Sequence, residues 1–393
     1  MQRVSQSPTD PDFVQNPYPF YGHLRSLGDF VHWQDYDLPM ATTAAAVNAV
    51  LRHPKLGRQL PDDKRQPTPA NLQPFYDVEK HSLLELEPPN HTRIRRLVLG
   101  AFTGRNVWSR SGSIRSIAED LIAKFPTGPF DLLDAYARPI PVLVISDMLG
   151  IPPAMSPDLL GWSNSMVSMY QARRDAKVEA QAAQAADEFS AYIRDLIAER
   201  QASPGQDLIS HLLTAEFGGQ KLTRDELVST VILLLNAGHE ATVHSLGNAV
   251  RNLAPFPDRQ AALTPNAAVA TAEECLRFDP PLHMFRRWVY EDVEILGVPF
   301  QKGSEIGCLL GSACRDDTIW PDGDTFDPFR EDFTNTAFGA GIHFCVGAPL
   351  ARLEMQIALS TLFQSCPDLR LTQEPTVANL YHFRGLERLM IQV

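Results

Sequence analysis

The chain has 393 residues, 44% of them hydrophobic and 21% charged, a balance typical of a soluble globular protein with ample material for a buried core. Its formal net charge of −12 argues against a nucleic-acid partner, because the phosphates would be repelled.

The cysteines and the N-terminus narrow the class of protein further. The five cysteines are odd in number and form no Cys-x-x-Cys pair, so they indicate neither a disulfide framework, a zinc site nor covalent c-type haem attachment. The segment Met1–Asp10 is polar and does not read as a signal peptide. The longest apolar run, Val231–Leu235, is too short to span a bilayer. We therefore expect a cytoplasmic protein that makes no membrane contact.

The N-terminal part predicts small elements ahead of a long loop. Residues 1–16 are polar and contain prolines, which predicts a flexible arm. Apolar spacing predicts a short helix over residues 17–27, a strand pair over residues 30–40 and a second short helix over residues 44–51. Residues 55–84 are rich in proline and polar side chains and include Phe75; loops of that length are usually functional or disordered.

A basic segment follows this loop. His91 and Arg95 are four residues apart on a helix that begins near Asn90, so both side chains project from one face and could close on one anionic group. Taken alone, the two residues are better explained as part of a solvated basic helix face. Between Asn90 and Ala118 the chain has six arginines and no acidic residue, which predicts a local positive patch.

Helical spacing continues to residue 253. Four helices are predicted over residues 114–124, 139–149, 159–173 and 176–200. Thr223 and Glu226 form a capping box, in which a hydroxyl and a carboxylate bond the first N–H groups of a helix. From there the apolar spacing continues to Leu253, which predicts a rod of about 45 Å. The chain shows no linker, repeat or composition break, so we expect residues 17–393 to form one domain.

The middle of this long helix has an unusual composition. Ala237, Gly238 and Ala241 carry almost no side chain, although glycine in a helix interior costs about 1 kcal/mol relative to alanine. A flat cofactor or a substrate could approach the backbone there. Glu240 lies close to an apolar run, where a charge needs compensation, and it could handle protons at a bound ligand.

A cysteine loop lies near the C-terminus. The stretch Phe338–Gly347 reads Phe-Gly-Ala-Gly-Ile-His-Phe-Cys-Val-Gly, and a helix is predicted directly after it. The glycines allow backbone N–H groups to turn toward the sulfur, and the positive end of the following helix points at the same atom. Both effects favour the thiolate form of Cys345. Without its neighbours, such a cysteine reads as an inert buried side chain.

Four motifs resemble those of the cytochrome P-450 family. They are His91-x-x-x-Arg95 after a proline pair, the helix centre Ala237–Thr242, Glu274-x-x-Arg277 and the cysteine loop Phe338–Gly347. The resemblance extends from the region of Pro17 to the C-terminus. It implies an α+β fold that is mainly α-helical with small β-sheets, in one haem-containing domain.

The resemblance implies a role for each matching residue. Cys345 would be the axial ligand of the iron of haem b, where a thiolate favours O–O cleavage. The residues that would contact the haem or its propionates are His91, Arg95, Ala237, Gly238, Arg287, Phe338, Gly339, His343 and Gly347. Glu274, Arg277 and Arg330 would form a buried structural network, since breaking a buried charge pair leaves an uncompensated ion.

One catalytic position departs from the family pattern. Glu240 matches the family's acid, but Ala241 stands where the family has a threonine whose hydroxyl relays protons. Three replacements are open: Thr242 or an ordered water, a hydroxyl on the substrate itself, or the use of peroxide in place of dioxygen. We favour the substrate hydroxyl, on the ground of the missing threonine alone.

The resemblance implies a monooxygenase that inserts one oxygen atom from O2 into an apolar small organic substrate, by hydroxylation, epoxidation or oxidative dealkylation. The substrate pocket would include Phe75, Met166, Leu235, Leu282, Phe285 and Phe383. A peroxide-driven peroxygenase and a non-oxygenating haem sensor are the alternatives.

The implied electron source is a second protein. The chain has no residues left over for a flavin or iron–sulfur domain, so electrons from NAD(P)H would arrive through a ferredoxin and its reductase. A docking face for an acidic ferredoxin is expected at Arg93, Arg96, Arg110 and Arg352, because opposite surface potentials speed encounter. We expect the enzyme itself to be a monomer.

Overall fold

The computed structural model describes residues 1–170, 174–331 and 335–393. Their contacts group the chain into two compact units. Unit 1 consists of Met1–Pro61, Ala118–Ala137 and Ala241–Val393, and unit 2 of Asp62–Ile117 and Arg138–Glu240. The single domain expected over residues 17–393 stays a prediction.

Unit 1 contains the strands found among the described residues. Its main sheet has the order β1-β2-β3-β9-β6-β4. These strands are β1 (Gln2–Val4), β2 (Phe30–Trp33), β3 (Leu38–Ala41), β9 (Glu305–Leu309), β6 (Met284–Val289) and β4 (Leu56–Gly57). The β1–β2 and β3–β9 pairs are parallel and the other neighbours are antiparallel. Two small sheets are formed by β10 (Arg370–Leu371), β11 (Met390–Gln392) and β5 (Phe130–Asp131), and by β7 (Val293–Ile295) and β8 (Val298–Phe300).

The first sixteen residues are folded rather than a flexible arm. Strand β1 pairs with β2, and helix α1 (Pro11–Gln15) buries Phe13, whose ring packs edge-on against Trp33 at a centroid distance of 5.7 Å. Arg384 donates hydrogen bonds to the carbonyls of Val14 and Gln15. A strand of three residues has too little alternation to be recognised from the sequence, and its partners are distant in the chain.

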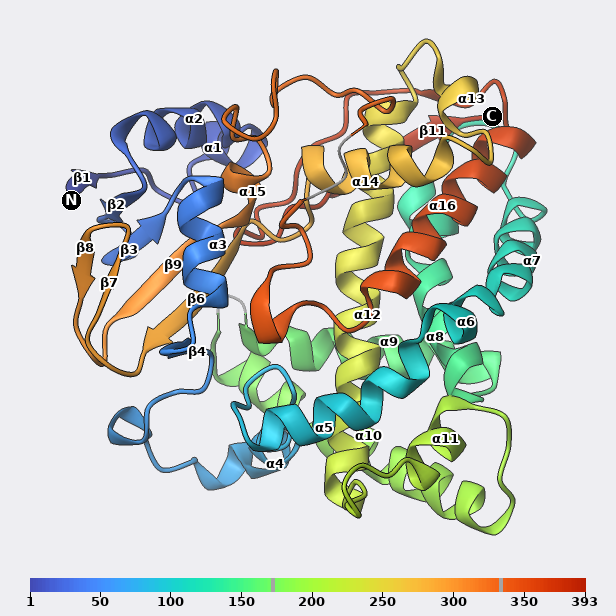
Figure 1. Cartoon of the computed structure of the whole chain (residues 1–393). Coiled ribbons are helices and arrows are strands. Elements are labelled where there is room, and N and C mark those ends of the chain that lie inside the picture. The colour runs from blue at the N-terminus through green and yellow to red at the C-terminus, as the bar shows by residue number, and fades with distance from the viewer. Residues whose placement is uncertain (171–173, 332–334) are drawn as a thin grey trace. The chain divides into compact units, whose positions relative to one another are not determined.

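Besides α1, unit 1 contains further α-helices among its described residues, some of which pack against the main sheet. They are α2 (Tyr18–Leu27), α3 (Ala44–Arg52), α13 (Arg259–Ala262), α14 (Ala268–Phe278), α15 (Leu310–Ala313) and α16 (Ala348–Ser365). Helix α3 lies across the sheet, with Val47 and Val50 in one apolar cluster with Ile306 and Cys308 of β9 (Figure 1). Helix α14 packs against α16, the helix that follows the cysteine loop.

The main elements of unit 2, among its described residues, are helices joined by loops. Its helices are α4 (Gln73–Glu79), α5 (Asn90–Leu99), α6 (Gly104–Trp108), α8 (Pro139–Leu149), α9 (Ser156–Val167), α10 (Ala176–Ala202) and α11 (Leu208–Thr214). Helix α10 packs along α9 and also contacts α4. Its alanine-rich part buries Ala182 and Ala186, which lets the neighbouring backbones come close. Of the helix predicted over residues 159–173, residues 171–173 lie outside the described part.

Two helices, α7 (Ser111–Ile122) and α12 (Arg224–Leu253), contribute residues to both units. The predicted capping box starts α12: the Thr223 N–H donates to Glu226 Oε2 at 2.8 Å, and the Glu226 N–H donates to Thr223 Oγ1 at 3.2 Å. The helix continues for 30 residues without interruption (Figure 1). Among the described residues, no helix combines the length and the apolar character that a membrane crossing requires.

Candidate active site

The cysteine loop depends on two glycines with left-handed backbone conformations. Gly339 has φ +71° and Gly341 has φ +73°, values that other residues rarely adopt. A Cβ at Gly339 would lie 3.0 Å from the Phe285 ring, and a Cβ at Gly341 would collide with the carbonyl oxygen of Leu51 at the end of α3. The loop therefore follows a path between β6 and α3 that larger residues would block.

Cys345 lies where this loop enters α16. Its N–H donates to the Phe338 carbonyl at 3.1 Å, which closes the loop, and Pro349 lies in the first turn of the helix. Cys345 is partly exposed, whereas Cys275, Cys308, Cys314 and Cys366 are buried. Burial raises the pKa of each of these four thiols, to about 12 for Cys308. The accessible sulfur at a helix N-terminus is thus the one suited to bind a metal as thiolate.

Arg352 of α16 braces the loop from the helix side. Its guanidinium lies 4.6 Å from the centroid of the Phe338 ring and forms an ion pair with the buried Glu273 of α14. Asn335 donates to the same carboxylate at 3.0 Å. Arg352 is therefore engaged within unit 1, although its sequence position predicted a docking cation.

Glu274, Arg277 and Arg330 come together in unit 1. The Glu274 carboxylate accepts two hydrogen bonds from Arg277, at 2.6 and 2.7 Å, and Arg330 Nε lies 3.5 Å from it. The Asp327 N–H also donates to Glu274, at 2.8 Å. Arg277 donates further to the carbonyls of Cys314, Gly323 and Thr325. Both ions of the central pair are buried and well hydrogen-bonded, as a structural role requires.

The middle of α12 is bare on one side. Ala237 and Gly238 are exposed although they lie inside a 30-residue helix, and a Cβ added at Gly238 would meet open space. Glu240 and Ala241 are half-buried, and Thr242 is buried. One turn later, the Ser245 hydroxyl donates to the Ala241 carbonyl at 2.9 Å. A flat cofactor can approach this backbone closely, so these residues fit a haem.

The four candidate propionate ligands are divided between the units. In unit 2, His91 is buried on α5 and Arg95 is half-buried one turn later. In unit 1, Arg287 of β6 is 2% exposed and donates to the Arg286 carbonyl at 2.8 Å, and the half-buried His343 belongs to the cysteine loop. A guanidinium matches a carboxylate in charge and in the geometry of its N–H donors, so Arg287 and Arg95 are chemically suited to hold haem propionates.

The candidate pocket residues have distinct surroundings. Leu282 and Phe383 form an antiparallel bridge in unit 1, which places these two candidates side by side. Phe285 instead faces the cysteine loop at Gly339 and has the Arg58 guanidinium 5.9 Å from its ring centroid. In unit 2, Phe75 packs near Tyr76 and Tyr170, Met166 contacts Asn236, and Leu235 is buried.

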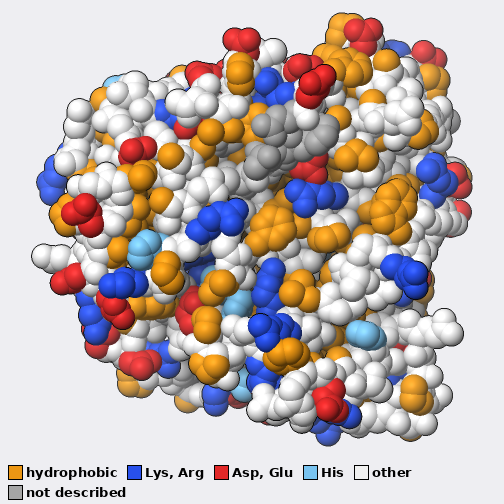
Figure 2. All heavy atoms as spheres, viewed as in Figure 1, with side chains coloured by type: hydrophobic (Ala, Val, Ile, Leu, Met, Phe, Trp, Pro, Cys, Tyr) orange, Lys and Arg blue, Asp and Glu red, His pale blue; other side chains and the backbone are white. Residues whose placement is uncertain are grey.

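The arginines of the expected docking face are largely engaged. Arg93 forms an ion pair with Glu226, Arg110 lies 3.2 Å from Asp147, and Arg96 stacks over Phe217. Figure 2 shows basic side chains in small groups with acidic and hydrophobic ones among them. These partners reduce the positive potential that the sequence alone predicts.

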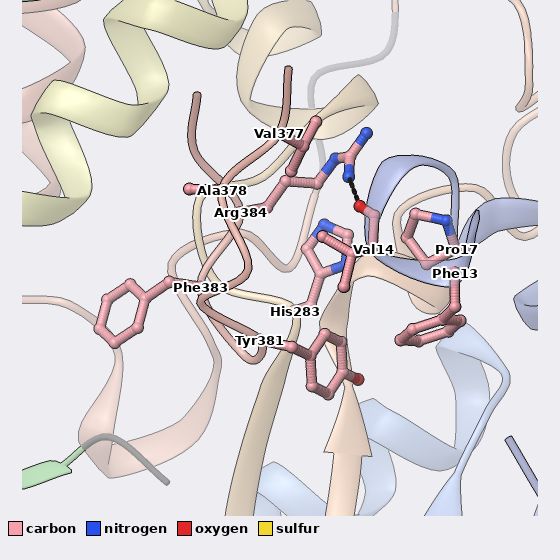
Figure 3. Close-up of a pocket in the computed structure, with 9 residues that line it drawn as sticks. All are labelled: Phe13, Val14, Pro17, His283, Val377, Ala378, Tyr381, Phe383 and Arg384. Carbon is pink, nitrogen blue, oxygen red and sulfur yellow. Dashed lines mark hydrogen bonds between the residues drawn. The ribbon is translucent and has the colours of Figure 1, made fainter. Parts of the chain in front are cut away.

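A buried network near the N-terminus is the main polar feature that the motifs did not indicate. Tyr18 donates to Asp279 at 2.6 Å, Arg384 Nε lies 2.5 Å from the same oxygen, and the Tyr21 hydroxyl lies 3.0 Å from His283 Nδ1. Figure 3 shows His283 and Arg384 among the residues that line a small cavity. Its volume of about 10 Å³ leaves room for about one water molecule. The network links α2 to the segments that carry Leu282 and Phe383.

The charges of this network fix the state of His283. Burial raises the pKa of Asp279, but Arg384 and Arg315 outweigh it and lower the pKa to about 2. Burial, with Arg384 adding to it, lowers the pKa of His283 to about 3, so the imidazole is neutral. Because an ionised carboxylate only accepts, Tyr18 donates to Asp279. The Tyr21 hydroxyl donates its one hydrogen to Tyr381 at 3.1 Å, so at its contact with His283 it accepts from Nδ1–H.

Comparison with known proteins decides the family. A family model described as "Cytochrome P450" matches residues 162–270 and 266–374. The chain belongs to the cytochrome P450 family. It is 39% identical to cytochrome P450 107B1 of Saccharopolyspora erythraea over 85% of this chain and 81% of that protein. It is 35% identical to a vitamin D(3) 25-hydroxylase of Pseudonocardia autotrophica over 96% of this chain and 94% of the relative.

Solved structures agree with this P450 assignment. The crystal structure of P450BioI in complex with an acyl carrier protein ligated to hexadec-9Z-enoic acid has a TM-score of 0.89 and 33% identity, over 97% of this chain and 99% of that one. The predicted fold class, family and P450 oxidoreductase activity are thereby confirmed, and the family implies a haem cofactor.

Proposed function

We propose that this P450 is a haem-thiolate monooxygenase in which Cys345 is the axial ligand of haem b. The observation that carries the proposal is the partly exposed sulfur at the start of α16, in a loop whose path requires Gly339 and Gly341. The bound haem would supply the oxygen-activating chemistry, and the thiolate donates electron density that favours O–O cleavage. Phe338 holds the Cys345 N–H through its carbonyl and Gly347 lies beside the sulfur, while Ala237 and Gly238, which have little or no side chain, would leave room for the ring.

His91, Arg95, Arg287 and His343 would neutralise the propionates. The support differs between them: Arg287 is a buried cation, and His91 and Arg95 share one face of α5. A propionate carboxylate would accept charge-assisted hydrogen bonds from these side chains.

Glu240 would move protons to the reacting centre. It is half-buried, at the border of the bare part of α12. Ala241 has no hydroxyl to pass a proton on, and the Ser245 hydroxyl is already donated to the Ala241 carbonyl. The remaining donors are Thr242 with an ordered water, or a hydroxyl of the substrate, which we favour.

Replacing Ala241 by threonine tests this choice. If the substrate supplies the donor, the added hydroxyl competes with it, and Ala241→Thr is expected to lower turnover of the true substrate. Better coupling of NADH consumption to product with no loss of turnover would contradict substrate assistance.

The substrate would be an apolar small organic molecule, and the residues proposed to contact it include Leu282, Phe383, Phe75, Met166 and Leu235. Relatives named as a vitamin D(3) 25-hydroxylase and as a biotin biosynthesis P450 act on dissimilar molecules, so the family does not define the substrate. Phe285 is the candidate with the weakest support, because its ring faces the cysteine loop.

Electrons would come from NAD(P)H through a ferredoxin reductase and an acidic ferredoxin, in the cytoplasm, to a monomeric enzyme. Arg93, Arg96 and Arg110 in unit 2 and Arg352 in unit 1 remain the proposed contacts. If charge reversal at Arg93 and Arg110 left the salt dependence of reduction unchanged, this docking site would be wrong.

A reconstituted system tests the activity. With ferredoxin, reductase and NADH, the proposal predicts O2-dependent product containing one oxygen atom from ¹⁸O2. Product from peroxide alone, with none from NADH and O2, would favour a peroxygenase. Binding without product under either condition would favour a haem sensor.

A further inference from the structure

Asn236 is a buried polar residue in the apolar part of α12. It follows the run Val231–Leu235 and is 8% exposed. Asparagine is a poor helix former, because its amide competes with the backbone for hydrogen bonds. Such a residue at this place in a helix requires a compensating partner for its amide.

The amide of Asn236 is only partly satisfied. Its Nδ2 donates to the sulfur of Met166 on α9 at 3.8 Å. A thioether can accept but not donate, so the nitrogen must be the atom that faces Met166. The oxygen Oδ1 is buried and has no hydrogen-bond partner within residues 1–170, 174–331 and 335–393.

A second polar group of the same kind lies on α9. The hydroxyl of Ser163, three residues before Met166, is buried and has no hydrogen-bond partner among the described residues. Side chains three apart on a helix share a face, so Ser163 and Met166 project to the same side of α9. Both Asn236 and Ser163 are therefore polar groups that flank a residue expected in the substrate pocket.

Asn236 lies one helical turn before Glu240, the residue of α12 that is proposed to handle protons. Asn236 and Glu240 are four residues apart, so they share one face of the helix with a rise of about 6 Å between them. A group bonded to Oδ1 would also lie within about two turns of Ala241, the position without a hydroxyl.

We propose that Asn236 is a specificity residue whose Oδ1 accepts a hydrogen bond from the substrate, and that the substrate is therefore an apolar molecule carrying a hydroxyl or N–H donor. This inference rests on the proposed monooxygenase function and narrows its substrate class. A buried acceptor without a partner penalises ligands that lack the donor, so recognition discriminates by the presence of that group.

The ligand-free protein provides the first test. Asn236→Leu removes the unsatisfied oxygen, so the thermal unfolding midpoint of the holoenzyme is expected to stay equal or to rise. Asn248 on the same helix is the matched control: its Oδ1 also has no partner among the described residues, but its Nδ2 donates to the carbonyls of Asp279 and Arg384, so Asn248→Leu is expected to lower the midpoint. A loss in Asn236→Leu as large as that in Asn248→Leu would overturn the proposal, because it would show a structural amide, for example one bonded to a buried water.

Matched ligands provide the second test. The spin-state absorption shift is titrated with 5α-androstan-3β-ol, its methyl ether and 5α-androstane, and with 1-adamantanol, its methyl ether and adamantane. The alcohols are expected to bind about tenfold more tightly than the ethers in the unchanged enzyme and equally in Asn236→Leu. The proposal would be overturned if the unchanged enzyme bound the alcohols no more tightly than the ethers. It would also be overturned if Asn236→Leu still bound the alcohols more tightly. If neither skeleton binds, the unfolding midpoints alone decide.

The absorption of the carbon monoxide complex distinguishes a failure of the proposed function from a failure of the role proposed for Asn236. Absence of the thiolate-type band in the unchanged enzyme would refute the proposed function. An intact band in every variant, together with an alcohol preference that Asn236→Leu does not change, would refute only the role of Asn236.

Discussion

Gly341 provides a direct test of how the cysteine loop is built. The substitution Gly341→Ala adds a Cβ at φ +73° that would collide with the Leu51 carbonyl. The left-handed conformation costs a non-glycine residue about 1 kcal/mol, and overpacking against a fixed backbone adds about 1–3 kcal/mol. The expected loss in free energy of unfolding is therefore about 2–4 kcal/mol, measured in urea on the holoenzyme.

Gly219 is the matched control for this prediction. It has φ +76°, but a Cβ there would meet no atom within 4 Å, so Gly219→Ala is expected to cost about 1 kcal/mol from the backbone conformation alone. Gly341→Ala is also expected to weaken the thiolate-type band of the carbon monoxide complex, whereas Gly219→Ala leaves it unchanged. Equal losses of stability in the two variants would refute the reasoning, because only Gly341 is enclosed.

Two further predictions concern buried charges. Glu274→Gln leaves the Arg277 guanidinium buried without its ion partner, so we expect the free energy of unfolding in urea to fall by about 3–5 kcal/mol. The control is Asp225→Asn in the exposed pair with Arg194, which is expected to cost at most about 1 kcal/mol. Similarly small losses in both variants would contradict a buried network. The folded-state pKa of His283, about 3, lies below its ordinary value of 6.5, so the unfolded chain binds the extra proton and this residue's contribution to stability falls as the pH drops from 6.5 toward 3. His283→Gln is expected to reduce the slope of unfolding free energy against pH by up to about 1.4 kcal/mol per pH unit between pH 6.5 and 4.5, and an unchanged slope would show that the imidazole is not held neutral.

Strong local patterns made part of the fold predictable. The helix expected over residues 139–149 is α8, with the same bounds, and α12 begins after the predicted capping box and ends at Leu253. In both cases a proline or a cap marks the start and helical apolar spacing continues to the end, so the information is contained in the segment itself. The strand β1 lacked this information, because its pairing with β2 depends on residues far along the chain.

Parts of the candidate site could not be predicted from the sequence, because they also depend on contacts between residues far apart in the chain. The motif spacing identified Cys345 and the Glu274–Arg277 pair, but not what surrounds them. The basic segment near Arg93 was expected to be a free positive surface, yet Arg93 pairs with Glu226, which is 133 residues away. The unsatisfied oxygen of Asn236 could not be recognised either, because it depends on which side chain of α9 faces the amide.

The carbon monoxide complex of the reduced protein tests the central claim most directly. We expect the red-shifted absorption band typical of sulfur-bound haem iron, its loss in Cys345→Ala, and its retention in Cys366→Ala, which removes a buried thiol from the other end of α16. A reduced protein without that band, or a band that survives in Cys345→Ala, would contradict the assignment of Cys345 as the iron ligand.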